Sequence, residues 1–77
     1  MSDKLIELFS GVLNVPVDNL NDDSSPDNID SWDSMSAMHL VSAIEAAFAV
    51  QLSTREIMRM SSIGLARSTL RDKGADV

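Results

Sequence analysis

The chain has 77 residues, a formal net charge of -6 at pH 7, a pI of about 4.3 and no cysteine. A chain of this length forms a single domain with a thin core, which leaves little room for a catalytic cleft and favours a binding, carrier or adaptor role. The acidic balance argues against nucleic-acid binding, because phosphate contacts need an excess of Lys and Arg. The lack of cysteine excludes disulfides and thiolate zinc sites, so any thiol chemistry needs an added group.

The N-terminus shows no basic segment followed by an apolar run, so we expect no signal peptide. The longest apolar-rich stretch, Met35 to Leu52, is interrupted by polar residues such as His39 and Glu45 and does not read as a membrane span. A monomeric, cytoplasmic protein is therefore expected.

Apolar residues at helical spacing predict a first helix over roughly Asp3 to Leu13, capped by Ser2 or Asp3. A long acidic loop, residues 15–33, follows without a single basic residue. Loops of this length in small domains are often functional. Three apolar residues are expected to pin the loop to the core: Val17, Leu20 and Ile29.

The strongest helical pattern runs from Ser34 to Val50. Its predicted buried stripe is broad, which favours burial on more than one side. The stripe consists of Met38, Val41, Ile44 and Phe48, widened by Leu40 and Ala47.

Two further helices complete the chain. Ser53 and Glu56 resemble a capping box for a short helix that ends near Met60. A last helix begins after Ser61 or Ser62, runs to about Arg71 and stops at Gly74, and residues 75–77 are expected to be frayed. Its inward residues are Ile63, Ala66 and Leu70. The predicted fold is a small all-α four-helix bundle, one domain over residues 1–77, with three longer helices, a short third helix and a long loop between the first two.

Ser34 is the first candidate for chemistry, since it stands where the acidic loop ends and an apolar helix begins. The free N–H groups and positive dipole end of a helix N-terminus suit a phosphate ester on this hydroxyl. Asp33 beside it offers a carboxylate to a metal or to a basic residue of a modifying enzyme. Spacing alone favours a plainer interpretation, in which Ser34 and Asp33 are a helix cap and its neighbour.

Other candidates are weaker. His39 lies about one and a half turns after Ser34, so the two do not share a helix face, and no Gly-rich elbow surrounds the serine. A calcium loop does not fit the spacing of the aspartates. Trp32, the single tryptophan, either anchors the loop to the bundle or contacts a partner, and we favour the anchor.

From residue 33 onward the chain resembles the acyl carrier proteins. The stretch Asp33-Ser34-Met35 is followed by an aliphatic-rich helix that contains Ile44-Glu45 and Phe48 in the family's register. Chain length, acidity, the long first loop and the Lys73-Gly74 ending match as well.

The resemblance implies that Ser34 is esterified with 4′-phosphopantetheine, taken from coenzyme A by a phosphopantetheinyl transferase that recognises Asp33. The thiol of this arm would carry an acyl group as a thioester. The helix after Ser34, with Met35 and Met38, would be the surface for acyl-loading, acyl-transfer or synthase enzymes with basic or apolar docking surfaces. An apolar gap would shelter the acyl chain. Its expected lining is Val41, Ile44, Ile57 and Ile63.

The chain departs from the housekeeping fatty-acid carriers at several positions. Ser31 stands in place of a usual Gly, and four positions on the expected recognition helix lack the usual or frequent acids: Ser36, His39, Ala46 and Ala47. Glu45 is the only acid on that helix. The pattern favours a specialised carrier of a fatty-acid, polyketide or other acyl pathway. An aminoacyl or peptidyl carrier and a helical adaptor without a prosthetic group stay open as alternatives, and a small hydrolase that uses Ser34 is disfavoured by geometry.

Overall fold

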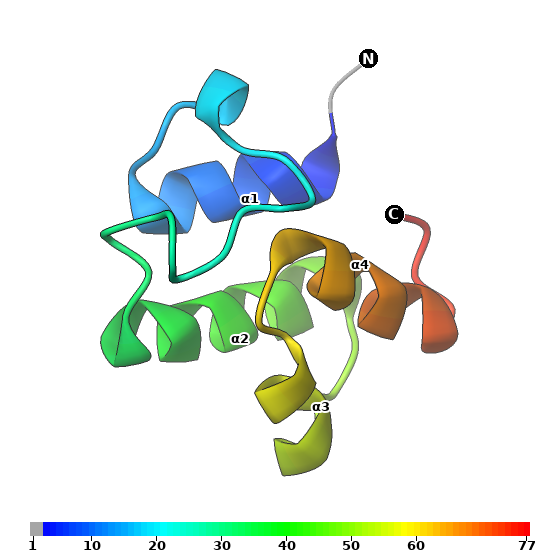
Figure 1. Cartoon of the computed structure of the whole chain (residues 1–77). Coiled ribbons are helices and arrows are strands. Elements are labelled where there is room, and N and C mark those ends of the chain that lie inside the picture. The colour runs from blue at the N-terminus through cyan, green and yellow to red at the C-terminus, as the bar shows by residue number, and fades with distance from the viewer. Residues whose placement is uncertain (1–2) are drawn as a thin grey trace.

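The computed structural model describes residues 3–77, and helices are the only regular secondary structure in this part of the chain (Figure 1). The predicted all-α bundle is confirmed. Its elements are α1 (Lys4–Leu13), the short 3-10 helix η1 (Val17–Asn19), α2 (Ser34–Phe48), α3 (Thr54–Arg59) and α4 (Ile63–Asp72). Within the described residues no helix is both long and apolar enough to cross a membrane.

The helix starts are fixed by side-chain caps that the sequence indicated. Asp3 caps α1; the other candidate, Ser2, lies outside the described residues. Ser53 and Glu56 form a complete capping box at the start of α3. Ser62 caps α4. Each cap satisfies backbone N–H groups that lack a partner within the helix.

The ends of α1 and α2 are set by left-handed residues. Asn14, with a φ of 58°, ends α1, and Ala49, with a φ of 54°, ends α2. Asparagine tolerates this conformation, whereas for alanine it costs about 1 kcal/mol. The second helix therefore stops at Phe48, earlier than the predicted Val50.

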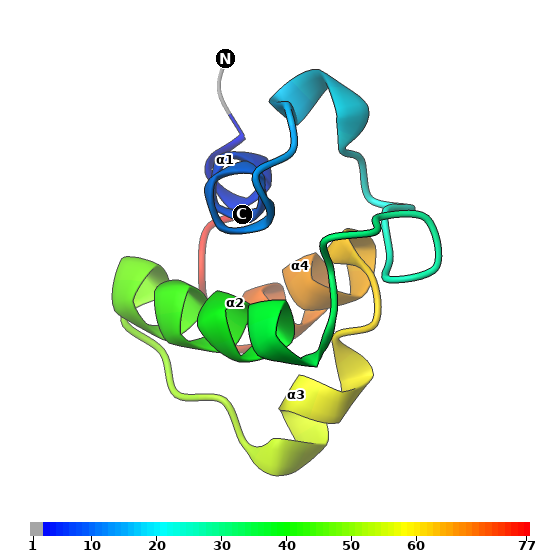
Figure 2. The same ribbon diagram turned by 90° about the vertical axis from the view of Figure 1, so that its left-hand side faces the viewer.

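The core lies where α1, α2 and α4 meet, and Figure 2 shows α1 crossing above α2 with α4 beside it. Loop residues Leu20 and Trp32 join it, and Ile29 packs partly against it. The buried helical residues are Leu5, Phe9, Leu13, Leu40, Ile44, Ile63, Ala66 and Leu70. The expected inward face of the last helix is thus confirmed.

Three predicted core positions are wrong. Ala47 lies in the last turn of α2, beyond the buried residues Leu40 and Ile44, and is exposed. Met38 is 72% exposed, because the buried face of α2 centres on Leu40 and Ile44 and residue 38 falls almost opposite to it. Val17 is 44% exposed in η1, where the chain turns so that Leu20 takes the buried position. The buried stripe of α2 is therefore narrower than the sequence suggested.

The long loop is held against the start of α4 by two backbone hydrogen bonds. The N–H of Ile63 donates to the carbonyl of Ser24 over 3.1 Å, and the N–H of Gly64 donates to the carbonyl of Asp22 over 2.9 Å. A Cβ atom added at Gly64 would stand 3.0 Å from that carbonyl oxygen. Glycine favours this close approach, because any side chain here would press on the carbonyl group of Asp22.

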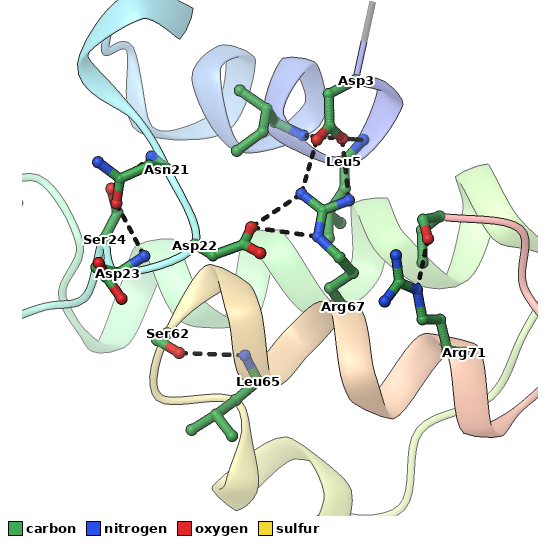
Figure 3. A network of polar contacts seen from close by, with 12 residues as sticks. Asp3, Leu5, Asn21, Asp22, Asp23, Ser24, Ser62, Leu65, Arg67 and Arg71 are labelled. Carbon is green, nitrogen blue, oxygen red and sulfur yellow. Dashed lines mark hydrogen bonds and ion pairs between the residues drawn. The ribbon is translucent and has the colours of Figure 1, made fainter.

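Arg67 of α4 joins the loop to the start of α1 (Figure 3). Its Nη2 lies 2.7 Å from Asp3 Oδ2 and 3.0 Å from Asp22 Oδ1. The hydrogen bond from Arg67 is the main reason that the pKa of the Asp3 carboxyl lies below its ordinary value of 3.8. One guanidinium therefore holds together three segments that are far apart in sequence.

We expect Arg67→Gln to lower the free energy of unfolding at pH 7 by about 1–2 kcal/mol, since Asp3 and Asp22 are 42% and 58% exposed and water screens both pairs. Because the folded-state pKa of Asp3 is depressed, its contribution is present above the unfolded pKa and is lost as pH falls through the folded one. Denaturant unfolding between neutral and acid pH measures this: the difference between wild type and variant should shrink below about pH 4. Arg59→Gln, on an exposed arginine of α3, is the control. An equal loss in both variants, or a difference that does not change with pH, would contradict the assignment.

The C-terminal residues differ from the frayed tail that was expected. Ala75 and Val77 are partly buried against the core. The N–H of Ala75 donates to the carbonyl of Leu70 over 2.9 Å, and Arg71 Nε donates to the carbonyl of Val77 over 2.7 Å. These contacts hold the segment after Gly74 against the bundle.

Candidate attachment site

Ser34 is the first residue of α2 and its side chain is exposed. Its hydroxyl makes no hydrogen bond with any residue that the structure describes, and the same holds for its backbone N–H. A phosphoryl group on this hydroxyl would meet a free N–H donor and the positive end of the helix dipole. The geometry therefore fits a phosphate ester on Ser34.

Asp33, and not Ser34, caps the helix. Its Oδ1 accepts a hydrogen bond of 3.0 Å from the N–H of Ser36. This bond is the main cause that lowers the pKa of the Asp33 carboxyl, which therefore stays ionised near neutral pH. The plainer interpretation of the sequence holds for Asp33 but leaves the Ser34 hydroxyl free.

Two serines that sequence reasoning did not assign fix the segment around the site. Ser31 Oγ donates to the carbonyl of Leu13 over 2.7 Å, and Ser36 Oγ donates to the carbonyl of Ser31 over 2.6 Å. The approach to Ser34 is thus tied both to the end of α1 and to the first turn of α2. Small hydroxyl residues on both sides of a helix start are the sequence signal for such bonds.

The outward face of α2 is apolar near Ser34. Met35 and Met38 are 74% and 72% exposed, and His39 is exposed as well. Glu45, the only acid of α2, is half-buried, and its Oε2 accepts a hydrogen bond of 2.8 Å from the N–H of Leu52. The acid therefore holds the connection to α3, and the exposed part of α2 carries no free carboxylate.

The predicted acyl pocket is only partly assembled. Val41 and Ile57 face each other across two adjoining hollows between α2 and α3. Ile44 and Ile63 line neither hollow, because both are fully buried in the core around α1. The other residues that line the hollows were not predicted to do so: Phe9, Trp32, Ala37, Met38, Leu40, Ser42 and Met60.

Trp32 is 6% exposed and serves as an anchor, as the favoured interpretation had it. Its ring lies against Phe9, with ring centroids 5.2 Å apart and planes tilted by 57°. The tryptophan holds the last part of the loop on the bundle just before the attachment segment.

Acidic residues do not form a metal site in the described part of the chain: no group of three or more His, Asp or Glu side chains comes close enough to hold an ion. Asp22 and Asp33 are engaged as an ion pair and a helix cap. His39 is exposed and shares no hydrogen bond with Ser34 among residues 3–77.

Comparison with known families agrees with this geometry. The sequence pattern of the family described as phosphopantetheine attachment site matches residues 3–65, which is most of the 77-residue chain. The chain belongs to this family. A comparison with curated proteins found no similar sequence.

Members of the family are carriers with a covalently attached 4′-phosphopantetheine, and they are not enzymes. The protein is therefore a small phosphopantetheine carrier protein. Carriers of this kind interact with a phosphopantetheinyl transferase and with synthase partners.

Proposed function

We propose that the protein is an acyl carrier protein that holds acyl groups as thioesters on a 4′-phosphopantetheine esterified to Ser34. The observation that carries the proposal is the exposed Ser34 hydroxyl, free of hydrogen bonds with the described residues at the N-terminus of α2, in a chain of this family. When bound, the group supplies the thiol that the chain lacks. Ser34 would hold its phosphate, and the backbone N–H of Ser34 and the positive end of the helix dipole would favour the negative charge.

The surface around Ser34 favours partners with an apolar docking patch. Met35 and Met38 give the first turns of α2 a polarizable, adaptable surface. The loop adds exposed carboxylates, including Asp27 and Asp30, on the approach to the site. A basic rim on the partner would speed encounter with the loop, while its apolar centre would meet the methionines.

An aminoacyl or peptidyl carrier is the alternative, since such carriers share the arm and the bundle. The apolar hollow beside α2 favours an acyl group, because Met38, Val41 and Ile57 offer contacts to a hydrocarbon chain and hardly any to a charged α-amino group. The partner enzymes decide which acyl pathway the carrier serves: fatty-acid, polyketide or another.

The proposal is tested by incubating the chain with coenzyme A and a broad-specificity phosphopantetheinyl transferase. Intact mass spectrometry should show one added phosphopantetheine, and fragmentation should place it on the peptide that contains Ser34. A known carrier in the same tube shows that the transferase is active. If that carrier is modified and this chain is not, the proposal is wrong.

We expect Asp33 to act both as helix cap and as a recognition element for the transferase. Asp33→Asn keeps a capping oxygen but removes the charge, so its melting temperature should stay near that of the wild type while the kcat/KM of modification falls about tenfold. Asp33→Ala should lower both. Asp30→Asn, an exposed acid of the same loop, is the charge control. Modification of the Asn variant at the wild-type rate would leave Asp33 with the capping role alone.

A further inference from the structure

The space between α2 and α3 consists of two hollows that share the side chains of Ala37, Val41 and Ile57. The outer hollow, about 210 Å³, opens to the surface between Met38 and Ser42. The inner one measures only about 30 Å³ and ends at residues of the core. Its additional walls are Phe9, Trp32, Leu40 and Met60. A chain that enters from the outside thus meets a space that narrows sharply.

The two volumes differ in what they can hold. A closed apolar cavity of about 150 Å³ binds a six-carbon ligand such as benzene, whereas a space of about 30 Å³ corresponds to a single water molecule. The outer hollow, at about 210 Å³, is therefore large enough for a short hydrocarbon chain, and the inner one, at about 30 Å³, is not. The entrance of the outer hollow lies at Met38, one helical turn from Ser34 and within reach of an arm attached to that serine.

Trp32 is one of the buried walls of the inner hollow, together with Phe9 and Leu40. Its indole is 6% exposed and rests against Phe9. The backbone that carries it is fixed, because the N–H of Trp32 donates to the carbonyl of Ile29 over 3.1 Å and neighbouring Ser31 is hydrogen-bonded to the end of α1. Met60, which also lines the inner hollow, is half-buried and flexible enough to move aside. The rigid indole is not.

We infer that Trp32 sets the depth of the acyl pocket and restricts the carrier to sheltering short acyl groups, a specificity role that rests on the proposed function. Chains of up to about six carbons lie in the outer hollow. The far end of a longer chain stays in water or is taken up by a partner enzyme. Trp32 acts only by limiting how far the acyl chain can enter, and it has no part in the attachment at Ser34.

The test compares acetyl, butyryl, hexanoyl, octanoyl and decanoyl thioesters on wild type, Trp32→Val and Trp32→Phe. Each is loaded from the acyl-coenzyme A by a broad-specificity transferase, and the alkaline hydrolysis rate of the thioester is divided by that of the same thioester on free pantetheine. Each sheltered methylene should slow hydrolysis by roughly fourfold. In the wild type, hydrolysis should stop slowing with chain length near hexanoyl. In Trp32→Val it should continue to slow, so that the decanoyl thioester hydrolyses at least about tenfold more slowly than in the wild type.

Trp32→Phe keeps an aromatic contact with Phe9 and replaces the valine variant if that variant does not fold. The longest acyl chain that it shelters should be shorter than in Trp32→Val but longer than in the wild type. Leu70→Ala is the matched control, since Leu70 is fully buried but lines neither hollow. The inference is overturned if wild-type protection keeps rising beyond octanoyl, or if Leu70→Ala extends the limit as far as the Trp32 variants do. If coenzyme A itself adds no arm, the proposed function fails and this inference with it; if the arm is added but protection does not depend on residue 32, only the inference fails.

Discussion

The Ser34→Ala variant is expected to gain no phosphopantetheine under conditions in which the wild type is modified completely. The reason is chemical, since the ester needs the hydroxyl oxygen and alanine offers none. The variant should fold as the wild type does, because Asp33 caps α2 and Ser34 makes no hydrogen bond with the described residues that could be lost. Intact mass spectrometry measures the modification, and thermal unfolding shows that the fold is intact.

Ser36→Ala is the matched control for this experiment. It removes the nearest other hydroxyl on α2, one that already donates to the carbonyl of Ser31. This variant should still be modified, with a slightly lower melting temperature because one hydrogen bond is lost. A mass gain that survives in Ser34→Ala and disappears in Ser36→Ala would move the attachment site and refute the assignment.

The Phe9→Ala variant is expected to lose about 3–5 kcal/mol of unfolding free energy, most of the stability of a domain this small. Phe9 is fully buried at the centre of α1, packs on Trp32 and lines the inner hollow. Removing the ring takes away its apolar burial and leaves a cavity between α1 and α2. Urea unfolding followed by the fluorescence of Trp32 measures the loss, because the indole is buried in the folded chain and enters water on unfolding.

Met38→Ala is the control for Phe9→Ala, since Met38 is larger than alanine but lies mostly in water. It should change the unfolding free energy by less than about 0.5 kcal/mol. Because the exposed Met38 is part of the proposed docking surface, the same variant should weaken partner contact while leaving the fold intact. Comparable destabilisation by both variants would mean that the core is not centred where the structure has it.

The helices could be predicted from sequence because the information for them is local. Asp3, Ser53 and Ser62 stand next to the N–H groups that they cap, and apolar spacing marks each helix. The family resemblance likewise depends on a contiguous stretch that begins at Asp33-Ser34. The end of α2 could not be predicted in this way: the left-handed Ala49 that ends it has no sequence signal, because alanine is the strongest helix former.

The acyl pocket could be predicted only in part. Val41, Ile44, Ile57 and Ile63 are all apolar residues at inward positions, and nothing in their types separates core from pocket. Which of them faces the space between α2 and α3 depends on how the helices cross. The same holds for Met38, an apolar residue that the crossing leaves in water.

The sequence by itself determined the all-helical class, the helix starts and the serine that stands at the start of α2, because caps and periodicity act between near neighbours. The tertiary structure alone decided that Arg67 joins Asp3 and Asp22, that Ala75 and Val77 pack on the bundle, and that Trp32 lines the inner hollow. These features join segments distant along the chain, and their formation depends on distances that only the packing of the helices fixes.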